Sequence, residues 1–367
     1  HVLTEQGHEA RGRFCILATG CLSVPQLPAI DGVEDFQGTR YQASLWPHEG
    51  VDFSGKTVGI IGTGSSGIQA IPVIAEQSEH LYVFQRTPNF SVPAVNDVLD
   101  QDWVAQFKKH YREHRRLHKE GLSSGFGDLE IEPRERTPAA ETAEGMSAEE
   151  VAAILDPYWE RGGAFFLSAF ADALANPITN EAIADYVRNK IRAIVKDPQT
   201  AETLCPTDHP IGSKRICVDT GYYATFNRDN VTLVDVRKDP IRTITETGLR
   251  TQTHEYEFDV LVLATGFDAM TGALLNMDIR GEGGQKLSDK WHAGPRTYLG
   301  MGVSGFPNLF TVTGPGSPSV LSNMLVSIEQ HVDWMVECIQ HMSISGYETV
   351  QPDPVAEEQW TEHVTEV

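Results

Sequence analysis

The sequence predicts an α/β protein built around a strand, a glycine turn, a helix and a second strand. An apolar run at 56–61 (KTVGII) has the length of a buried strand and leads directly into the glycine-rich segment 62–67 (GTGSSG). A helical stretch is expected at 68–77, followed by another apolar strand at 81–85 (LYVFQ). Two strands joined through a glycine turn and a helix are typical of a βαβ unit, which belongs in a parallel sheet.

The remaining elements are less regular. A Pro-rich linker is expected at 21–32, and the polar stretch 121–146, rich in Gly, Pro and Ser, is expected to be mobile. Residues from about 97 to 201 form charged segments with a helical pattern, which suggests a helical insertion. Further strands are expected at 13–20, 231–236 and 260–264, and further helices at 102–120, 148–160, 180–195 and 322–342.

Composition and charge exclude several classes of protein. The 367 residues carry a formal net charge of -22, which disfavours nucleic acid and anionic membranes as partners. No apolar run approaches the roughly 20 residues of a membrane span. The five cysteines form no CxxC pair and the histidines form no HExxH pattern, so neither a disulfide framework nor a metal site is expected. Reduced thiols favour the cytoplasm. The chain opens with His1 inside a strand-like stretch, and we interpret it as an internal fragment.

The glycine segment matches the pattern GxGxxG in the context that gives this pattern meaning, after a strand and before a helix. Gly62 permits the tight turn, Gly64 lets the backbone approach a pyrophosphate, and Gly67 allows close packing of helix and strand. The helix N-terminus then offers unpaired N–H groups to the phosphates. Ser65 and Ser66 are interpreted as phosphate-facing or capping residues. The alternative is a glycine turn without a ligand.

The end of the next strand indicates which dinucleotide is bound. NAD sites place Asp or Glu about 20 residues after the glycines, to hold the ribose 2′-hydroxyl. This sequence has Gln85, Arg86 and Thr87 there and no acid. A guanidinium and a hydroxyl suit a 2′-phosphate, which predicts NADP. The alternative is that Arg86 is a solvated surface charge.

Two other patterns, a repeated ATG and a pair of basic residues, do not by themselves indicate a function. The sequence ATG occurs at 18–20 and again at 264–266, each time after an apolar strand, which suggests two equivalent strand ends beside a cofactor. Lys214 and Arg215 form a basic pair in an acidic chain. From spacing alone, a surface pair that bridges to nearby carboxylates is the favoured interpretation.

The segment 36–47 (FQGTRYQASLWP) places Phe36, Gly38, Trp46 and Pro47 in the spacing FxGxxxHxxxWP. This pattern resembles the fingerprint of type I Baeyer–Villiger monooxygenases, and ordered motifs along nearly the whole chain resemble that family as well. Gln42 stands at the histidine position. The other segments that resemble the family, in the family's order, are GTGSSGIQ, FQRTPN, PIGSKR, GYYATFNRDNV, LATGFDAMTG, GPRTYLG and GFPNLF with GPGSPS.

The resemblance implies an enzyme that uses NADPH, FAD and O2 to insert one oxygen atom beside a ketone carbonyl through a C4a-peroxyflavin. Arg215 matches the family's active-site arginine and Lys214 its NADP-phosphate lysine. The resemblance therefore replaces the interpretation of Lys214 and Arg215 as a surface pair bound to nearby carboxylates. The implied NADP contacts are Gly62, Thr63, Gly64, Ser65, Ser66, Gly67, Gln69, Arg86, Thr87 and Lys214. The implied FAD contacts are Thr19, Gly20, Gly266 and Met324, together with the stretch 314–324. The implied substrate pocket contains Ile216, Ser319, Val320 and Leu321.

The loop 318–324 (PSVLSNM) is similar to the longer loop of the phenylacetone and steroid monooxygenases, which favours bulkier aryl or polycyclic ketones within an expected range of aryl, cyclic or steroid-like ketones. The family's fingerprint histidine lies on the hinge between two cofactor domains. Glutamine keeps a donor and an acceptor but cannot be protonated. We therefore expect Gln42 to slow the coupling of flavin reduction to oxygenation without loss of the fold.

The fold implied by the resemblance contains two Rossmann-like dinucleotide-binding domains, with the FAD domain incomplete in this chain and a helical insertion in the NADP domain. Both ends of the family's chain, including its first FAD fingerprint, fall outside this sequence. The expected boundaries are 1–33 for the end of the first FAD segment and linker, 34–97 and 218–266 for the NADP domain, 98–217 for the insertion, and 267–367 for the second FAD segment.

Two further function classes stay open at this stage. One is a related NADPH-dependent flavoprotein that oxygenates nitrogen or sulfur or acts as an uncoupled oxidase, and the other is a non-catalytic NADP-binding protein. The expected partners are a ketone and O2, with the protein a monomer or a weak homo-oligomer.

Overall fold

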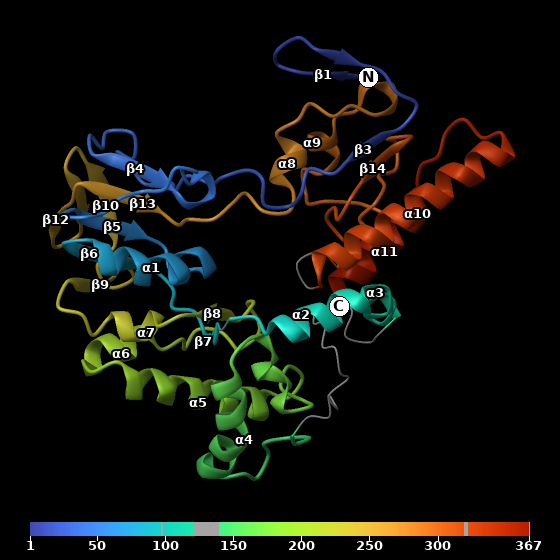
Figure 1. Ribbon diagram of the computed structural model, residues 1–367. Coiled ribbons are helices and arrows are strands. Elements are labelled where there is room, and N and C mark those ends of the chain that lie inside the picture. Colours follow the sequence, from blue (N-terminus) through green and yellow to red (C-terminus); the bar gives the residue numbers. More distant parts are fainter. Residues whose placement is uncertain (97, 121–138, 319–321, 367) are drawn as a thin grey trace. The chain divides into compact units, whose positions relative to one another are not determined.

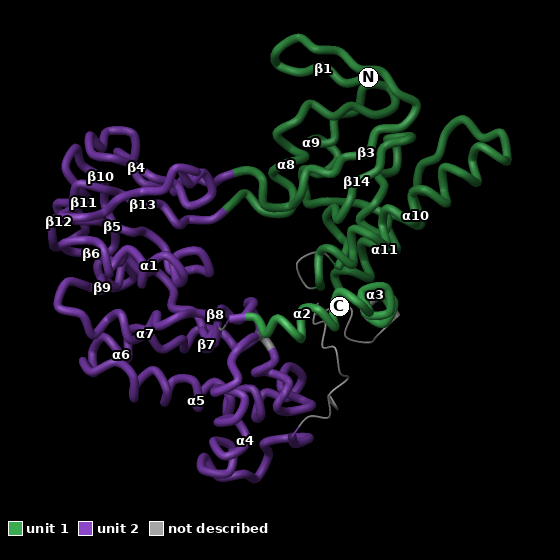
Figure 2. The backbone as a smooth tube through the Cα atoms, in the orientation of Figure 1, with its two compact units in different colours: residues 1–24, 99–132, 267–367 green, residues 25–98, 133–266 purple. Residues whose placement is uncertain are grey.

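A computed structural model of the chain describes residues 1–96, 98–120, 139–318 and 322–366. The chain divides into two compact units, each built from segments that are distant in the sequence (Figure 1 and Figure 2). Unit 1 comprises His1–Val24, Leu99–Glu132 and Phe267–Val367. Unit 2 comprises Pro25–Val98 and Pro133–Gly266. The expected helical insertion is therefore divided between the two units. Part of the polar stretch expected to be mobile, 121–138, lies outside the described residues.

A five-stranded parallel sheet forms the centre of unit 2, in the order β4–β13–β5–β6–β9. This confirms the α/β class. Ile60 and Ile61 of the middle strand point to opposite faces, and each is buried in a different cluster of side chains. A strand buried on both faces has a continuous apolar sequence, as KTVGII does. The strands are β4 (Thr39–Gln42), β5 (Thr57–Ile61), β6 (His80–Gln85), β9 (Val231–Asp235) and β13 (Val260–Leu263).

Different elements cover the two faces of this sheet. On one face Ile60 and Val83 pack with Ile68 and Ile71 of α1 and with the helices that follow it. On the other face Ile61 and its neighbours pack against the three-stranded antiparallel sheet β10–β11–β12. These elements are α1 (Ser65–Gln77), α4 (Ala148–Arg161), α5 (Pro177–Ile194), α6 (Pro198–Leu204), α7 (Tyr222–Thr225), β10 (Ile241–Thr245), β11 (Gly248–Thr251) and β12 (Glu255–Glu257).

A separate two-stranded parallel ribbon in unit 2 joins β7 (Ser91–Pro93) to β8 (Cys217–Asp219). The sequence analysis did not predict either strand, because each has only three residues and the partners lie more than a hundred residues apart. Two 3₁₀ helices, η1 (Ala43–Leu45) and η2 (Ala164–Ala169), complete the unit.

Unit 1 is smaller and holds two short sheets. A hairpin joins β1 (Val2–Leu3) to β2 (Glu9–Ala10), and β3 (Cys15–Leu17) pairs in parallel with β14 (Leu309–Thr311). Its core consists of two clusters, one around Trp291 and Phe306 and one around Phe310 and Met335. The helices are α2 (Gln101–Lys109), α3 (Tyr111–Glu120), α8 (Gly272–Leu275), η3 (Glu282–Gly284), α9 (Leu287–Lys290), α10 (Met324–Ser345) and α11 (Pro354–Glu366).

Several element boundaries differ from those that the sequence predicts. The helix expected at 68–77 begins three residues earlier, at Ser65, because Gly64 serves as its N-cap and the last glycine of the motif lies inside the first turn. The helix expected at 102–120 is interrupted at His110, which separates α2 from α3. The strand expected at 13–20 is only three residues long. Helix α11 was not predicted.

Candidate functional site

The glycine turn lies where the order of strands in the sheet of unit 2 reverses. The chain passes from β5 through α1 to β6 on one side, whereas β13 pairs with the other side of β5. A crevice at the carboxyl ends of such strands is the usual ligand site of open α/β sheets. Gly62 has a φ of 112°, and a Cβ there would lie 2.4 Å from the carbonyl oxygen of Ala264 at the end of β13. Glycine is therefore required at this position.

The three glycines of the turn have different surroundings. A Cβ on Gly67 would lie 2.2 Å from the carbonyl oxygen of Gly62, inside the turn itself. A Cβ on Gly64 would meet no atom within 4 Å, although its φ of -80° is open to any residue. Gly62 and Gly67 are therefore needed by the fold, whereas the space beside Gly64 is free for a ligand.

Side chains that follow β6 fix the shape of the turn. The hydroxyl of Thr63, a buried residue, donates to the carbonyl of Thr87 over 3.1 Å. In return the amide of Asn89 donates to the carbonyl of Thr63 over 2.8 Å. Within α1, the Gln69 side chain donates to the Ser65 carbonyl over 3.1 Å. These bonds hold the predicted residues Thr63, Thr87, Ser65 and Gln69 around one turn.

The residue that ends β6 points away from the turn. Gln85 is buried, and its side chain donates to the carbonyl of Thr203 over 2.8 Å. Arg86 is exposed, and no hydrogen bond or ion pair to it is found within the described residues. Its guanidinium is therefore available to an external anion.

The basic pair Lys214 and Arg215 is exposed and directly precedes β8. The N–H of Cys217 donates to the Phe90 carbonyl over 3.1 Å, and the Ser91 hydroxyl donates to the Cys217 carbonyl over 3.2 Å. Burial raises the pKa of the Cys217 thiol, and a hydrogen bond with the Ser65 side chain opposes that shift. The contact with Ser65 brings the segment that carries the basic pair to the start of α1.

A buried carboxylate organises the ribbon beneath this segment. Asp219 accepts from the Ser91 hydroxyl over 2.5 Å and from the backbone N–H of Tyr222 over 2.8 Å. The Tyr223 hydroxyl donates to the Asn89 carbonyl over 3.3 Å and accepts from the Ser91 N–H over 3.2 Å. Sequence analysis gave Asn89, Asp219 and Tyr223 no role. Asn89 lies two residues after Thr87, and its closeness in the sequence to the predicted pair Arg86 and Thr87 is the signal that could have identified it.

The fingerprint residues have mainly packing roles in unit 2. The rings of Phe36 and Phe258 lie 5.5 Å apart, and Trp46 packs with Tyr41 at 5.6 Å. A Cβ on Gly38 would lie 2.4 Å from the Asp259 carbonyl oxygen. The Pro47 carbonyl accepts from the Gly50 N–H over 3.2 Å.

Gln42 is the last residue of β4 and pairs with Leu263 of β13. Its side-chain nitrogen is buried and has no hydrogen-bond partner among the described residues. Within the part of the chain that the structure describes, the side-chain amide of Gln42 is thus an unpaired donor at the carboxyl end of β4, which β13 separates from β5.

The two predicted ATG segments follow β3 in unit 1 and β13 in unit 2. Thr19 is partly buried and its carbonyl accepts from the Ser23 hydroxyl over 2.8 Å, while Gly20 and Gly266 both have positive φ. Met324 is the first residue of α10, and Ile216 packs against the core of unit 2. The predicted pocket residues Ser319, Val320 and Leu321 lie outside the described residues.

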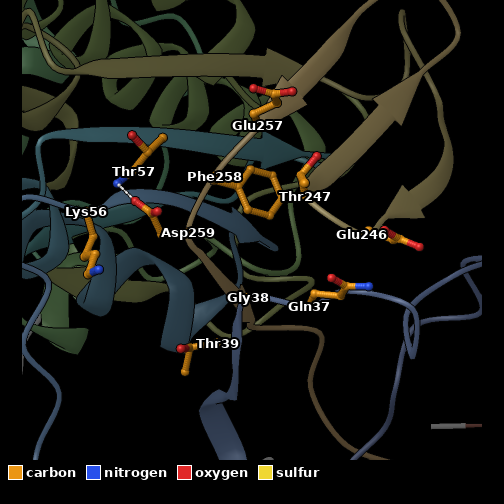
Figure 3. A pocket seen from close by; sticks show the side chains of 10 residues that line it. All are labelled: Gln37, Gly38, Thr39, Lys56, Thr57, Glu246, Thr247, Glu257, Phe258 and Asp259. Carbon is orange, nitrogen blue, oxygen red and sulfur yellow. Dashed lines mark hydrogen bonds between the residues drawn. The ribbon is translucent and has the colours of Figure 1, made fainter.

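A concavity of about 570 Å³ in unit 2 borders the fingerprint residue Gly38 but is lined by no residue of the glycine turn or of the basic pair. Lys56, Thr57, Thr39 and Asp259 line it, at the amino ends of β5, β4 and β13 (Figure 3). The glycine turn lies at the other end of the strands, at the carboxyl end of β5. In the part of the chain that the structure describes, no group of three or more His, Cys, Asp or Glu residues could hold a metal ion. No helix among these residues is both long and apolar enough to cross a membrane.

The parallel sheet and the glycine turn at its reversal point define an α/β protein of the Rossmann type. No family model matches the chain. The 2-oxo-Δ3-4,5,5-trimethylcyclopentenylacetyl-CoA monooxygenase of Pseudomonas putida is 41% identical over 96% of the chain, and a Baeyer–Villiger monooxygenase of Pseudooceanicola batsensis is 38% identical over 98%. The chain spans 64% of the length of each.

A solved structure of oxidized steroid monooxygenase bound to NADP is 48% identical, with a TM-score of 0.88, and covers 98% of this chain and 67% of its own. The chain belongs to the Baeyer–Villiger monooxygenase family.

Proposed function

We propose that this chain is the NADP-binding part and a portion of the FAD-binding part of an enzyme that converts a ketone to an ester or lactone with NADPH and O2. The observation that carries the proposal is the open space beside Gly64 at the start of α1, with Arg86 and the Lys214–Arg215 segment in the same unit. Unit 2 is assigned to NADP, and the described parts of unit 1 to FAD. The segment 98–217 stays a proposed helical insertion.

The residues present fit a dinucleotide phosphate. The first N–H groups of a helix are unpaired and attract anions, and Gly64 leaves room for a pyrophosphate to approach them. Ser65 and Ser66 lie in the first turn, where their hydroxyls can bind phosphate oxygens. Arg86, which has no partner among the described residues, would hold the 2′-phosphate together with Thr87 and Lys214. Bound NADPH and FAD supply the hydride transfer and the activation of O2.

Arg215 is proposed as the catalytic cation. A guanidinium stays protonated at neutral pH, so it can stabilise negative charge that develops on the oxygen of a reacting ketone. Its backbone carbonyl lies 4.0 Å from the Cys217 thiol. The N–H of Cys217 donates to the Phe90 carbonyl, and the Cys217 carbonyl accepts from the Ser91 hydroxyl. The ribbon thus holds the residues that follow Lys214 and Arg215, and the side chains of both are exposed.

Thr19, Gly20, Gly266 and Met324 are proposed FAD contacts, because the resemblance to the family implies them. Ile216 and the loop that contains Ser319, Val320 and Leu321 are proposed to border the ketone. Gln42 is proposed to act at the hinge. All five cysteines are free thiols, which supports a proposed cytoplasmic location, and a monomer or weak homo-oligomer is the proposed state.

The test uses the enzyme that carries this chain, loaded with FAD. Arg215→Ala is expected to bind NADP+ as the unmodified enzyme does and to form no ester from a ketone. Arg242→Ala is the matched control, because Arg242 is also an exposed arginine of unit 2 but lies on the antiparallel sheet. It is expected to leave ester yield unchanged.

Gas chromatography of the products, with NADPH consumption and hydrogen peroxide measured in parallel, decides between the candidate functions. Peroxide without ester from a panel of aryl and cyclic ketones would establish an uncoupled oxidase. An N-oxide or sulfoxide from an amine or thioether, without ester, would establish the heteroatom oxygenase. Normal ester yield from Arg215→Ala would refute the role of Arg215.

A further inference from the structure

Three side chains from different parts of unit 1 hold the backbone of the turn that follows β14. The Nδ1 atom of His331 in α10 accepts from the N–H of Thr313 over 3.0 Å. The hydroxyl of Thr297 donates to the carbonyl of Pro315 over 2.7 Å, and the indole N–H of Trp360 in α11 donates to the carbonyl of Gly316 over 2.9 Å. The shape of residues 313–316 therefore depends on side chains as well as on the strand that precedes it.

Thr313 is the strained point of this turn. Its φ is 51°, in the left-handed region that a β-branched residue rarely adopts. Such conformations cost free energy and persist only where the surroundings impose them. The N–H of Thr313 donates to the imidazole of His331. Thr313 is 4% exposed and His331 is 5% exposed, so water does not readily replace the imidazole.

The geometry defines the protonation state of His331. A ring nitrogen that accepts a hydrogen bond carries no proton, so the ring is neutral with its hydrogen on Nε2. Burial lowers the pKa of His331 below its usual value, which maintains that state. The segment 309–317, which contains Thr313, has no ionisable side chain. The nearest acids along α10 are Glu329 and Asp333, and they pair with Arg115 and Lys119 of α3.

We propose that His331 is a positioning residue, which holds Thr313 and the turn 313–316 in their present shape only while its ring is neutral. A protonated ring presents an N–H at Nδ1 to the N–H of Thr313, so the bond is lost and Thr313 can relax to negative φ. The consequence for the cofactor rests on the proposed function and on the FAD contacts that the family resemblance implies near this turn, among them Gly314 and Met324. Acidification would then reshape a flavin-contacting loop without protonating any group that touches the flavin.

Hydrogen exchange of the Thr313 amide in the 367-residue chain tests this directly. Mass spectrometry with electron-transfer fragmentation of peptides spanning 309–318 is performed from pH 7.5 to pH 4.5, and rates are converted to protection factors. His331→Phe keeps the volume of the ring but removes the acceptor. His331→Asn is the matched control, because its Oδ1 lies at the branch position of Nδ1 and does not titrate.

The unmodified chain is expected to protect Thr313 at pH 7.5 and to lose that protection at least about tenfold as the pH falls through the lowered pKa of His331. His331→Asn is expected to keep the protection at every pH, and His331→Phe to lack it at every pH. Equal pH profiles for the unmodified chain and His331→Asn would overturn the proposal, even if His331→Phe does not fold. So would full protection in folded His331→Phe. Because the measurement needs no cofactor, its failure is separate from a failure of the proposed flavin contact.

Discussion

Alanine substitutions at two glycines of the turn can distinguish effects on stability from effects on ligand binding. Gly67 has no room for a side chain, whereas Gly64 faces open space. In Gly67→Ala the new methyl would lie 2.2 Å from the carbonyl oxygen of Gly62, so the turn must move by about 1 Å to restore ordinary contact. Overpacking of this kind typically costs about 1–3 kcal/mol. For a folded unit of this size each kcal/mol lowers Tm by about 2–4 °C, so we expect a loss of about 2–12 °C.

Gly64→Ala is expected to behave in the opposite way. Its φ of -80° is allowed for alanine and no atom lies within 4 Å of the new methyl, so the free energy of unfolding should change by less than about 1 kcal/mol. The methyl would instead occupy the space through which a pyrophosphate reaches the start of α1. We expect the Kd for NADP+ to rise at least about tenfold, equivalent to about 1.4 kcal/mol.

Differential scanning fluorimetry and calorimetric titration with NADP+ measure the two effects on the same protein samples. The reasoning would be refuted if Gly64→Ala lowered Tm as much as Gly67→Ala does while NADP+ binding stayed unchanged. That result would mean that Gly64 serves the fold and that the phosphates bind elsewhere.

Three other perturbations test separate parts of the structure. Arg86→Ala should weaken NADP+ by about 1.5–3 kcal/mol, the usual worth of a charge-assisted hydrogen bond, and leave NAD+ unchanged, so equal weakening of both in calorimetry would contradict the 2′-phosphate assignment. Glu357→Ala leaves Lys290, whose side chain is 14% exposed, without its carboxylate and should lower the free energy of unfolding in urea by about 3–5 kcal/mol. Glu358→Ala breaks the exposed pair with Arg296 and should lower it by at most about 1 kcal/mol, so similar losses for the two variants would contradict the role of the Lys290–Glu357 pair. Chiefly through the Thr251 hydroxyl, the pKa of Asp239 is lowered from 3.8 to about 2, so its stabilisation is present above pH 3.8 and lost as the pH falls through about 2; an Asp239→Asn variant whose Tm deficit persisted at pH 2 would contradict this.

The local part of the fold could be predicted from the sequence. The run KTVGII followed by GTGSSG predicts β5, the turn and α1, because strand length, glycine spacing and the helical pattern all occur within about 20 consecutive residues. The exact start of α1 could not be predicted, because the N-cap is a glycine that carries no side-chain signal. Arg86 and Thr87 were identifiable for the same local reason, since they follow β6 directly.

The long-range part could not be predicted from pattern alone. Asp219 accepts a hydrogen bond from Ser91, 128 positions earlier, and no periodicity links two strands of three residues each. From the sequence, His331 is indistinguishable from any buried residue of an amphipathic helix. Only the structure shows that its imidazole accepts a hydrogen bond from Thr313. The basic pair shows the same limit, because its meaning depends on the family's ordered motifs and on the contact between Cys217 and Ser65.

The position of β13 beside β5 has a consequence for biosynthesis. The register pairs Val58 with Val260, so the middle strand of the sheet lacks one neighbour until 202 further residues have been made. At synthesis rates of about 5–20 residues per second, that interval lasts about 10–40 s. During it, Ile60 and Ile61 have no partner on one edge of their strand, while β6 can already pair on the other. A nascent chain with an unpaired apolar strand edge is a substrate for chaperones, and its dependence on them is expected to end when β13 leaves the ribosome.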